Sequence, residues 1–307
     1  GERIADFACG TGGFLVSALN ALYEDAQKSN ENREIYNNSV YGVEKKALPH
    51  ILCVTNMMLH DIDNPEIIHG NTLETDYKEY RKQEKFDVVL MNPPYGGNEK
   101  NSVKANFPME LRSSETADLF INIIMFRLKK KGRCAIIIPD GFLFGTDNAK
   151  VNIKTKLLTE FNLHTVVRMP SSVFAPYTGI TTNILFFDNT YPTKETWFYR
   201  VDMPEGYKHF SKTRPMKLEH FAEVLDWWDN REEIEIDGFP KAKKYSAETL
   251  LNEMNCNLDL CGYPHEEEEI LAPLDLINQY QQKRAELNAE IDEILGHFIS
   301  ILKNCDE

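Results

Sequence analysis

The chain has 307 residues, of which 42% are hydrophobic, so it is long enough for about two domains with a sizeable core. Its 34 basic and 48 acidic side chains give a formal net charge of −14, which argues against a protein that grips nucleic acid by itself. The acidity is uneven, because residues 1–190 hold 21 Lys and Arg against 23 Asp and Glu, whereas residues 191–307 hold 13 against 25. The first part is therefore close to neutral and the last part is strongly acidic.

The cysteines and the apolar runs limit the class of protein further. The six cysteines are dispersed without a CxxC pair, so they do not predict a disulfide scaffold, and no His cluster predicts a metal site. The first residues lack the basic and apolar segments of a secretory signal. The apolar runs 121–126 and 134–138 fall short of the ~20 residues that a membrane helix needs. We expect a cytoplasmic protein with reduced thiols and no membrane partner.

Short apolar runs alternate with helical patterns along the first 190 residues. This alternation indicates βαβ units and a mostly parallel sheet. Two runs, 86–91 and 133–138, are apolar almost throughout, as is typical of central strands covered on both faces. We predict strands over 3–7, 39–43, 67–69, 86–91, 133–139, 165–169 and 183–188, and helices over 13–28, 48–59, 119–130 and 151–160. The expected fold is an open, mostly parallel α/β sheet with helices on both faces.

The pattern changes from about residue 191, where polar and Pro-containing stretches follow one further strand-like run at 197–201. Near the end, apolar residues recur at three- and four-residue steps, which indicates a heptad seam on a long helix. The seam consists of Ile277, Tyr280, Leu287, Ile291, Ile294, Phe298 and Ile301. An amphipathic helix on its own domain and a coiled coil with a partner both fit this seam. We predict three parts: a sheet domain over 1–190, an irregular acidic extension over 191–265 and a heptad helix for subunit contacts over 266–307.

A glycine-rich turn follows the first predicted strand and reads D-x-A-C-G-T-G-G-F over residues 6–14. Glycines permit tight turns and a close approach of the backbone to a ligand, and open α/β sheets bind ligands at the carboxyl ends of their strands. The turn has neither the G-x-G-x-x-G pattern nor the GK[ST] pattern, so it does not indicate a dinucleotide or P-loop site. A turn without a ligand is the alternative interpretation.

Two further strand ends carry polar side chains. Glu44 follows the second strand, where a carboxylate can accept hydrogen bonds from both hydroxyls of a ribose, although an exposed charge is the alternative. Asn71 and Thr72 follow the third strand, and an Asn there can hydrogen-bond to an adenine edge. Together with the glycine turn, these strand ends predict a site shaped for a nucleoside.

The buried strand 86–91 leads directly into Asn92, Pro93, Pro94 and Tyr95. The prolines fix φ and remove N–H donors, which leaves carbonyl acceptors. An Asn oxygen and a proline carbonyl can accept both hydrogens of an exocyclic amine, while the neighbouring ring stacks on the base. Such acceptors favour a pyramidal nitrogen whose lone pair can attack, and positioning and fixed dipoles then provide catalysis. A Pro-rich turn that closes the strand is the alternative interpretation.

Loop 6–14 resembles the S-adenosylmethionine loop of amino-group DNA methyltransferases, and 92–95 resembles their catalytic tetrapeptide. The loop comes first, and Asn71 and Met91 are only twenty positions apart, which is similar to the gamma arrangement of adenine-N6 enzymes. Four further segments resemble the modification (methylase, M) subunit of type I restriction-modification systems: 138–141, 172–179, 182–187 and 257–260. The chain is therefore identified as a member of that family.

The resemblance implies a Rossmann-like methyltransferase sheet over 1–190, a largely helical C-terminal tail and transfer of methyl from S-adenosylmethionine to adenine N6 in DNA. It implies cofactor contacts from Asp6, Ala8, Cys9, Gly10, Thr11, Gly12, Gly13, Glu44, Asn71 and Thr72. It implies catalytic roles for Asn92, Pro93, Pro94 and Tyr95, with the Tyr95 ring stacking on a base extruded from the duplex. Phe187 is a second aromatic candidate, for which a buried strand position is the alternative.

The resemblance also implies that DNA is bound within a complex. The expected partner is a specificity (S) subunit, with a second M subunit and a restriction (R) subunit as further candidates. Family members carry an N-terminal helical region, which we expect to be absent ahead of Asp6. Two other functions stay open: a methyltransferase for a protein glutamine or an RNA amino group, and a non-catalytic assembly subunit.

Overall fold

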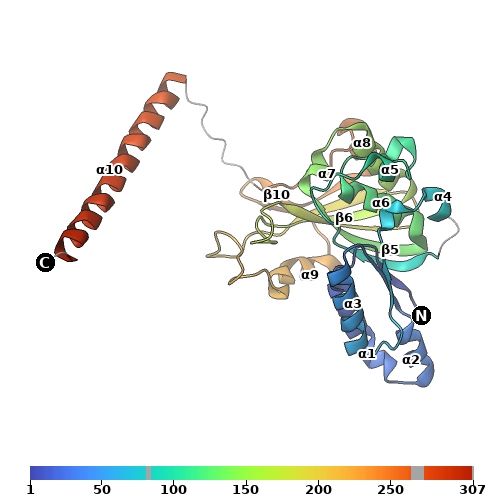
Figure 1. The fold of residues 1–307 in the computed structure, drawn as a ribbon. Helices are drawn as coiled ribbons and strands as arrows, with labels where there is room; N and C mark the ends of the chain where they lie inside the picture. The colour runs from blue at the N-terminus through green and yellow to red at the C-terminus, as the bar shows by residue number, and fades with distance from the viewer. Residues whose placement is uncertain (81–83, 264–272, 306–307) are drawn as a thin grey trace. The chain divides into compact units, whose positions relative to one another are not determined.

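The structure is a computed structural model that describes residues 1–80, 84–263 and 273–305 (Figure 1). In these ranges a ten-stranded sheet has the order β3-β2-β1-β4-β5-β7-β6-β8-β10-β9. Its strands are β1 (Ile4–Asp6), β2 (Val40–Glu44), β3 (Glu66–His69), β4 (Phe86–Met91), β5 (Leu128–Pro139), β6 (Asn162–Arg168), β7 (Thr182–Asp188), β8 (Glu195–Arg200), β9 (Ile234–Ile236) and β10 (Phe239–Ser246).

The strands that carry the candidate site residues run in one direction. β3, β2, β1, β4 and β5 form parallel pairs, so their carboxyl ends share one edge of the sheet. β7 lies antiparallel between β5 and β6, and therefore β6 runs in the same direction as β4 and β5. β8 is parallel to β6, whereas β10 and β9 add antiparallel pairs at the far edge. The prediction of an open, mostly parallel α/β sheet is confirmed.

Helices cover both faces of this sheet. Figure 1 shows α1, α2 and α3 on one side of the strands and α5, α6, α7 and α8 on the other. The helices are α1 (Gly13–Ala26), α2 (Asn30–Asn37), α3 (Ala47–Leu59), α4 (Tyr77–Tyr80), α5 (Asn101–Lys104), α6 (Thr116–Arg127), α7 (Asp140–Phe144), α8 (Asn148–Glu160), α9 (Ala222–Asp229) and α10 (Pro273–Cys305). Short helical turns are η1 (Thr72–Glu74), η2 (Met109–Leu111), η3 (Leu218–Phe221) and η4 (Thr249–Glu253).

The main hydrophobic core lies between the sheet and α6. This helix is buried nearly all round, and Leu119, Ile123 and Ile124 pack with strand residues such as Val89 and Ile136. A second cluster under α1 and α3 packs against the first strands. Apolar side chains thus cover the parallel strands on both faces and leave polar side chains to the strand ends. Five cysteines are free thiols buried in these layers: Cys9, Cys53, Cys134, Cys256 and Cys261. The side chain of Cys305 lies outside the described part.

Two predicted elements differ from the structure. The helix expected over 119–130 ends at Arg127, because Leu128 already pairs with Phe86 at the start of β5 and Lys131 takes a φ of 65° at an irregular step of that strand. In the extension expected to be irregular over 191–265, β8 matches the strand-like run at 197–201, and β9 and β10 add two strands that were not expected. The pairing of Thr165 with Trp197 continues the sheet past the expected boundary at residue 190. Residues Gly1–Tyr263 therefore form one compact unit.

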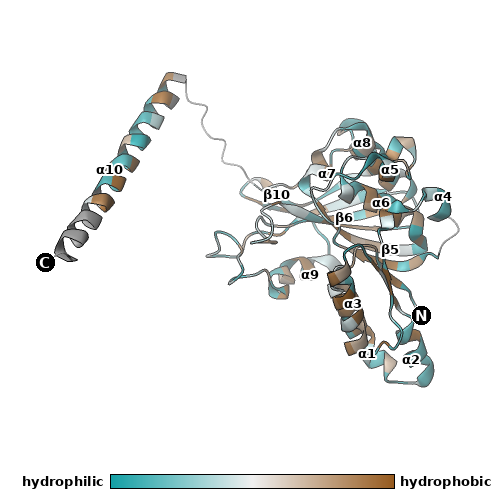
Figure 2. Cartoon of the chain, in the orientation of Figure 1, coloured by the Kyte–Doolittle hydropathy of each residue, from teal (hydrophilic) through white to brown (hydrophobic). Residues whose placement is uncertain are grey.

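The helix predicted by the heptad seam is present as α10, which belongs to a second unit. Each of five apolar residues on this helix exposes more than half of its surface: Ile277, Tyr280, Leu287, Ile291 and Ile294. Figure 2 shows brown, hydrophobic segments between teal, hydrophilic ones along α10. The seam's Phe298 and Ile301 have side chains outside the described residues, as does the segment 264–272. Within the ranges that the structure describes, no helix has the length and apolar character of a membrane span.

Candidate functional site

The glycine turn after β1 fits closely against α3. Gly12 has a φ of 87° and caps the start of α1, and its N–H donates to the Cys9 carbonyl at 2.8 Å. A Cβ at Gly12 would lie 2.8 Å from the Cys53 Sγ and 3.1 Å from the Met57 Cε. Both the positive φ and the close approach therefore require glycine at this position. The Cys9 side chain is buried beneath the turn, 3.7 Å from the Cys53 sulfur.

Glu44 ends β2 beside this turn, and backbone N–H groups fix its carboxylate. Its Oε2 accepts a hydrogen bond from the Gly10 N–H at 2.9 Å, and its Oε1 accepts one from the Lys46 N–H at 2.7 Å. Each carboxylate oxygen keeps a further lone pair for a ligand hydroxyl. The two loops at the ends of β1 and β2 are thus joined through one acidic side chain.

Asp6 lies below the turn, with only 2% of its surface exposed. Its Oδ1 accepts a hydrogen bond from the Ala8 N–H at 3.0 Å. Burial, with the nearby Glu44 carboxylate adding to it, raises the pKa of Asp6 to about 7. Two carboxylates therefore lie at this end of the site, and a bound cation would favour the ionised form of Asp6.

Asn71 and Thr72 follow the end of β3, at the start of η1. The Asn71 Oδ1 accepts from the Leu73 N–H at 3.2 Å, and its Nδ2 donates to the Glu74 carboxylate at 3.2 Å. The buried Thr72 hydroxyl donates to the Phe7 carbonyl at 2.7 Å, which ties the end of β3 to the end of β1. Three neighbouring strand ends are therefore joined by side-chain hydrogen bonds.

In the tetrapeptide after β4, the side chains of Tyr95 and Asn92 are hydrogen-bonded to each other. The Tyr95 hydroxyl donates to the Asn92 Oδ1, and burial raises the pKa of Tyr95, so the phenol stays protonated. The Tyr95 ring meets Phe174 edge-on, with centroids 6.1 Å apart and an interplanar angle of 62°. The Asn92 oxygen keeps a second lone pair that can accept from an amine. An amide acceptor and two aromatic rings thus lie together at this strand end.

One cavity of about 320 Å³ joins these strand ends. This volume is within the usual range for a small-molecule site. Its wall includes the predicted residues Ala8, Gly10, Glu44, Asn71, Thr72, Asn92 and Pro94, together with Phe7, Lys45, Lys46, Pro49, Gly70, Leu73, Glu99, Thr116 and Phe120. Lys45 follows β2 and Glu99 follows the tetrapeptide, and their charged groups lie 3.6 Å apart. The nucleoside-shaped end and the tetrapeptide end therefore form one continuous site.

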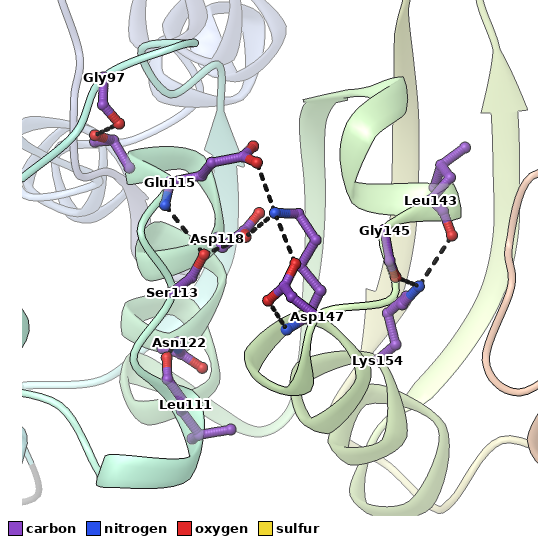
Figure 3. Close-up of polar contacts among 12 residues, drawn as sticks. Gly97, Leu111, Ser113, Glu115, Asp118, Asn122, Leu143, Gly145, Asp147 and Lys154 are labelled. Carbon is purple, nitrogen blue, oxygen red and sulfur yellow. Dashed lines mark hydrogen bonds and ion pairs between the residues drawn. The ribbon is translucent and has the colours of Figure 1, made fainter.

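The start of α6 holds the loop that follows the tetrapeptide. The Thr116 N–H and hydroxyl both donate to the Gly97 carbonyl, at 3.0 and 2.7 Å. The Lys150 ammonium group, on α8, contacts the carboxylates of Glu115 at 2.6 Å and Asp118 at 3.2 Å. Figure 3 shows Glu115, the residue before α6, and Asp118 of α6 on the side facing Asp147. A partly buried ion cluster between the start of α6 and α8 therefore supports one wall of the cavity.

The comparisons with known proteins agree with this geometry. Residues 1–269 match the family model described as N-6 DNA Methylase. The chain belongs to the N-6 DNA methylase family. It is 45% identical to the type I restriction enzyme EcoEI methylase subunit of Escherichia coli, over 96% of this chain and 61% of that relative. The family that the motifs predict is thus confirmed.

Two solved structures of type I systems share the methylase fold of this chain. A chain from work on complex assembly and conformational transition of a type I R-M system has a TM-score of 0.76 at 34% identity, over 96% of this chain and 61% of that one. The type I methyltransferase subunit of Streptococcus thermophilus has a TM-score of 0.65 at 26% identity, over 85% and 53%. The chain thus spans about three fifths of the EcoEI relative and of the first of these structures.

Several of the site residues that the sequence predicts are not part of the cavity wall. This second group comprises Asp6, Cys9, Thr11, Gly12, Gly13, Pro93 and Tyr95. Asp6, Cys9, Gly12 and Pro93 are buried beneath the loops, whereas Thr11 and Gly13 are exposed. Sequence reasoning missed Thr116 and Phe120, which reach the cavity from α6. No local pattern marks them, because their position depends on how α6 packs against the sheet.

Phe187 does not reach the cavity in this methylase. It is fully buried on β7, edge-on to Phe161 with ring centroids 5.9 Å apart. Helices and sheet cover it on all sides, so it has no surface on which a base could stack. The aromatic ring that contacts Tyr95 is instead that of Phe174, in the loop after β6. The F-A-P-Y stretch from residue 174 offered a signal, because it places an aromatic residue in a loop rather than in a strand.

Proposed function

We propose that this chain transfers a methyl group from S-adenosylmethionine to adenine N6 in DNA, as the modification subunit of a type I restriction-modification enzyme. The observation that carries the proposal is the single cavity that has Glu44 and Asn71 at one end and Asn92 and Pro94 at the other. A methyl donor and an amino acceptor must share one cavity for direct transfer, since the reacting atoms have to approach closely. The relatives' names support the reaction type.

The residues at the first end fit S-adenosylmethionine. Glu44 would bind the ribose hydroxyls, Asn71 would reach the adenine, and Thr72 would hold the loop that carries Asn71 in place. The buried Asp6 carboxylate lies under the loop that would surround the methionine part. Ionised carboxylates complement the ammonium and sulfonium charges of this cofactor. When bound, S-adenosylmethionine supplies an electrophilic methyl group on sulfur.

The residues at the second end fit an extruded adenine. The Asn92 oxygen and the Pro93 carbonyl would accept the two N6 hydrogens, while Tyr95 and Phe174 would face the base. The Tyr95 hydroxyl donates to the Asn92 oxygen and so orients the amide before the base arrives. With its hydrogens held, N6 directs its lone pair at the methyl carbon, and one N6 proton leaves to water after transfer. The chain's thiols and carboxylates take no covalent part.

A partner would read the DNA sequence. The near-neutral first part, with 21 basic against 23 acidic residues, has too few surplus cations for tight phosphate binding. The exposed apolar seam of α10 is a surface for another helix, and we assign it to contacts with a specificity subunit. A second M subunit and an R subunit complete the proposed cytoplasmic assembly. The isolated chain should therefore bind duplex DNA weakly.

The test is a methyl-transfer assay with the specificity subunit present. Tritiated S-adenosylmethionine is incubated with unmethylated duplex DNA, and the labelled product is identified after digestion to nucleosides. N6-methyl-2′-deoxyadenosine is the expected labelled nucleoside. Label that enters only RNA or a protein glutamine would instead establish the first alternative function. A full chain that does not bind S-adenosylmethionine in calorimetry would instead be a non-catalytic assembly subunit.

A further inference from the structure

A second cavity, of about 410 Å³, lies at the opposite edge of the sheet. Its wall includes His164 near the start of β6, Glu195 and Trp197 near the start of β8, and Arg231 after α9. Because β6 and β8 run in the same direction as β4, these positions lie at the amino ends of the strands, whereas the catalytic cavity lies at the carboxyl ends. The second cavity is therefore a separate site.

Arg231 presents a cation to this cavity without an acidic partner. Its Nη1 donates to the Thr165 hydroxyl at 2.8 Å, and its guanidinium carbon lies 4.4 Å from the ring centre of Trp228 and 5.4 Å from that of Trp227. No ion pair links Arg231 or Lys194 to a carboxylate in the part of the chain that the structure describes. Arg231 is half-buried, so its charge is partly desolvated, and this burial lowers the pKa of Arg231. A partly desolvated cation without a counter-charge favours binding of an anion.

Lys194 adds a second cation to this wall, and the nearby Asp188 carboxylate accepts a hydrogen bond from Asn162 at 2.9 Å. The Lys194 ammonium lies 5.6 Å from the ring centre of Tyr191, on the same wall. The Glu195 carboxylate is neutralised by Lys244 at 3.0 Å. Burial and the charge of Arg231 lower the pKa of His164 to about 4, so this ring is uncharged at neutral pH. Two cations therefore face the cavity, beside the exposed ring of Tyr191 and the half-buried ring of Trp197.

We propose that this cavity binds a nucleotide, with the phosphate on Arg231 and Lys194 and the base against Tyr191 or Trp197. A guanidinium matches the geometry of phosphate oxygens, and flat rings stack on any base. The rings of Tyr191 and Trp197 lie beside the ammonium groups of Lys194 and Lys244. A base can stack on such rings and the carboxylate of an acidic protein segment cannot, so the observations favour the nucleotide. A free nucleotide and a unit of single-stranded nucleic acid share this chemistry. The inference is independent of the methyl-transfer proposal, because the cavity lies at the other edge of the sheet.

The chain offers a direct optical probe of this site. Its three tryptophans all lie here, because Trp197 lines the cavity and Trp227 and Trp228 stack with Arg231. GTP is titrated into the full chain while tryptophan fluorescence is recorded, with and without excess S-adenosylmethionine. A guanine base is chosen because adenine nucleotides also fit the proposed cofactor end. We expect saturable quenching that S-adenosylmethionine does not change, and about tenfold weaker binding of guanosine and of inorganic triphosphate.

Three variants decide which residues bind the nucleotide. Arg231→Gln and Lys194→Gln should each weaken GTP binding by about tenfold or more, since each removes a charged hydrogen-bond donor to phosphate. Lys194 is exposed, so the Lys194→Gln variant should fold even if the Arg231→Gln variant does not. The matched control is Arg214→Gln, because Arg214 also stacks on a ring, Tyr207 at 5.6 Å, but lies outside the cavity. This control should bind GTP as the parent chain does.

Competition experiments identify the source of the nucleotide. Displacement of GTP by a short oligothymidylate would support a nucleic-acid strand, and failure to displace it would support a free nucleotide. The proposal is overturned if GTP causes no saturable change, or if Arg231→Gln and Lys194→Gln fold and bind GTP as tightly as the control. Tighter binding of polyglutamate than of GTP would also overturn it and assign the cavity to an acidic protein segment.

Discussion

The two ends of the cavity that we propose as the catalytic site are built from different chemistry. At the cofactor end, the carboxylates of Asp6 and Glu44 accept hydrogen bonds from backbone N–H groups. At the amine end, the uncharged side chains of Asn92 and Tyr95 bond to each other beside Phe174. Charge suits a cationic cofactor, whereas dipoles and rings suit a neutral base. The difference teaches that binding of the cofactor and transfer of its methyl group are separable, and substitutions at each end should separate them.

Asn92→Ala should break the amine end alone and have the largest effect. We expect methyl transfer to fall by about a hundredfold to a thousandfold, because the amide that holds the amine is lost. S-adenosylmethionine affinity should stay within about twofold, since the carboxylates are untouched. Transfer is measured with tritiated cofactor and affinity by calorimetry. Asn30→Ala, on the exposed start of α2, is the control and should match the parent chain. Transfer by Asn92→Ala within a few-fold of the parent would refute the role of this residue.

Two phenylalanines test which aromatic residue belongs to the amine end. Phe187→Ala should lower the free energy of unfolding by about 3–5 kcal/mol, because it empties a fully buried position. Phe174→Ala should leave stability nearly unchanged but reduce kcat/KM by about tenfold to a hundredfold, since a base loses a stacking surface. Denaturant unfolding and transfer assays on both variants measure this. Equal losses of stability in the two variants would contradict the assignment.

The ion cluster behind the amine end has a smaller expected effect. Lys150→Met should lower the free energy of unfolding by about 2–3 kcal/mol, because it leaves the buried Asp118 without its cation while Glu115 and Asp147 stay partly solvated. Transfer should fall with cofactor affinity retained, since α6 holds the loop at Gly97. Lys156→Met is the control on the same helix, where the pair with Glu160 is more exposed and should contribute below about 1 kcal/mol. If S-adenosylmethionine affinity fell as steeply as methyl transfer, the ion cluster would not act through the loop at Gly97 alone.

Asp6 provides the smallest and most specific test, at the cofactor end. Its pKa in the free protein is raised to about 7, and a bound cation would lower it, so binding releases a proton below that pH. S-adenosylmethionine affinity should therefore rise by about tenfold from pH 6 to pH 8 and then level off. Calorimetry in buffers of different ionisation enthalpy measures the released proton. Asp6→Asn should make the profile flat, and a pH dependence that survives this change would have to come from another group.

The strand ends were predictable because their signals are local. The alternation of apolar runs with helical patterns placed Asp6, Glu44, Asn71 and Asn92 after successive strands, and parallel pairing brings such ends to one edge. The end of the helix at Arg127 was not predictable, since only pairing with Phe86 turns the next residues into a strand. β8 matches the strand-like run predicted at 197–201, but β9 and β10 were missed, because their partners lie elsewhere in the chain.

By itself, the sequence determined the family, the parallel sheet and the chemistry of each strand end, since motif, period and turn residues act over short distances. Only the tertiary structure decided which aromatic residue faces Tyr95, because the period of a strand does not say which of its faces meets a cavity. It also decided that α6 supplies Thr116, and that Arg231 meets His164 and Trp197 at the opposite edge. Those contacts join distant segments, and packing rather than local propensity brings them together.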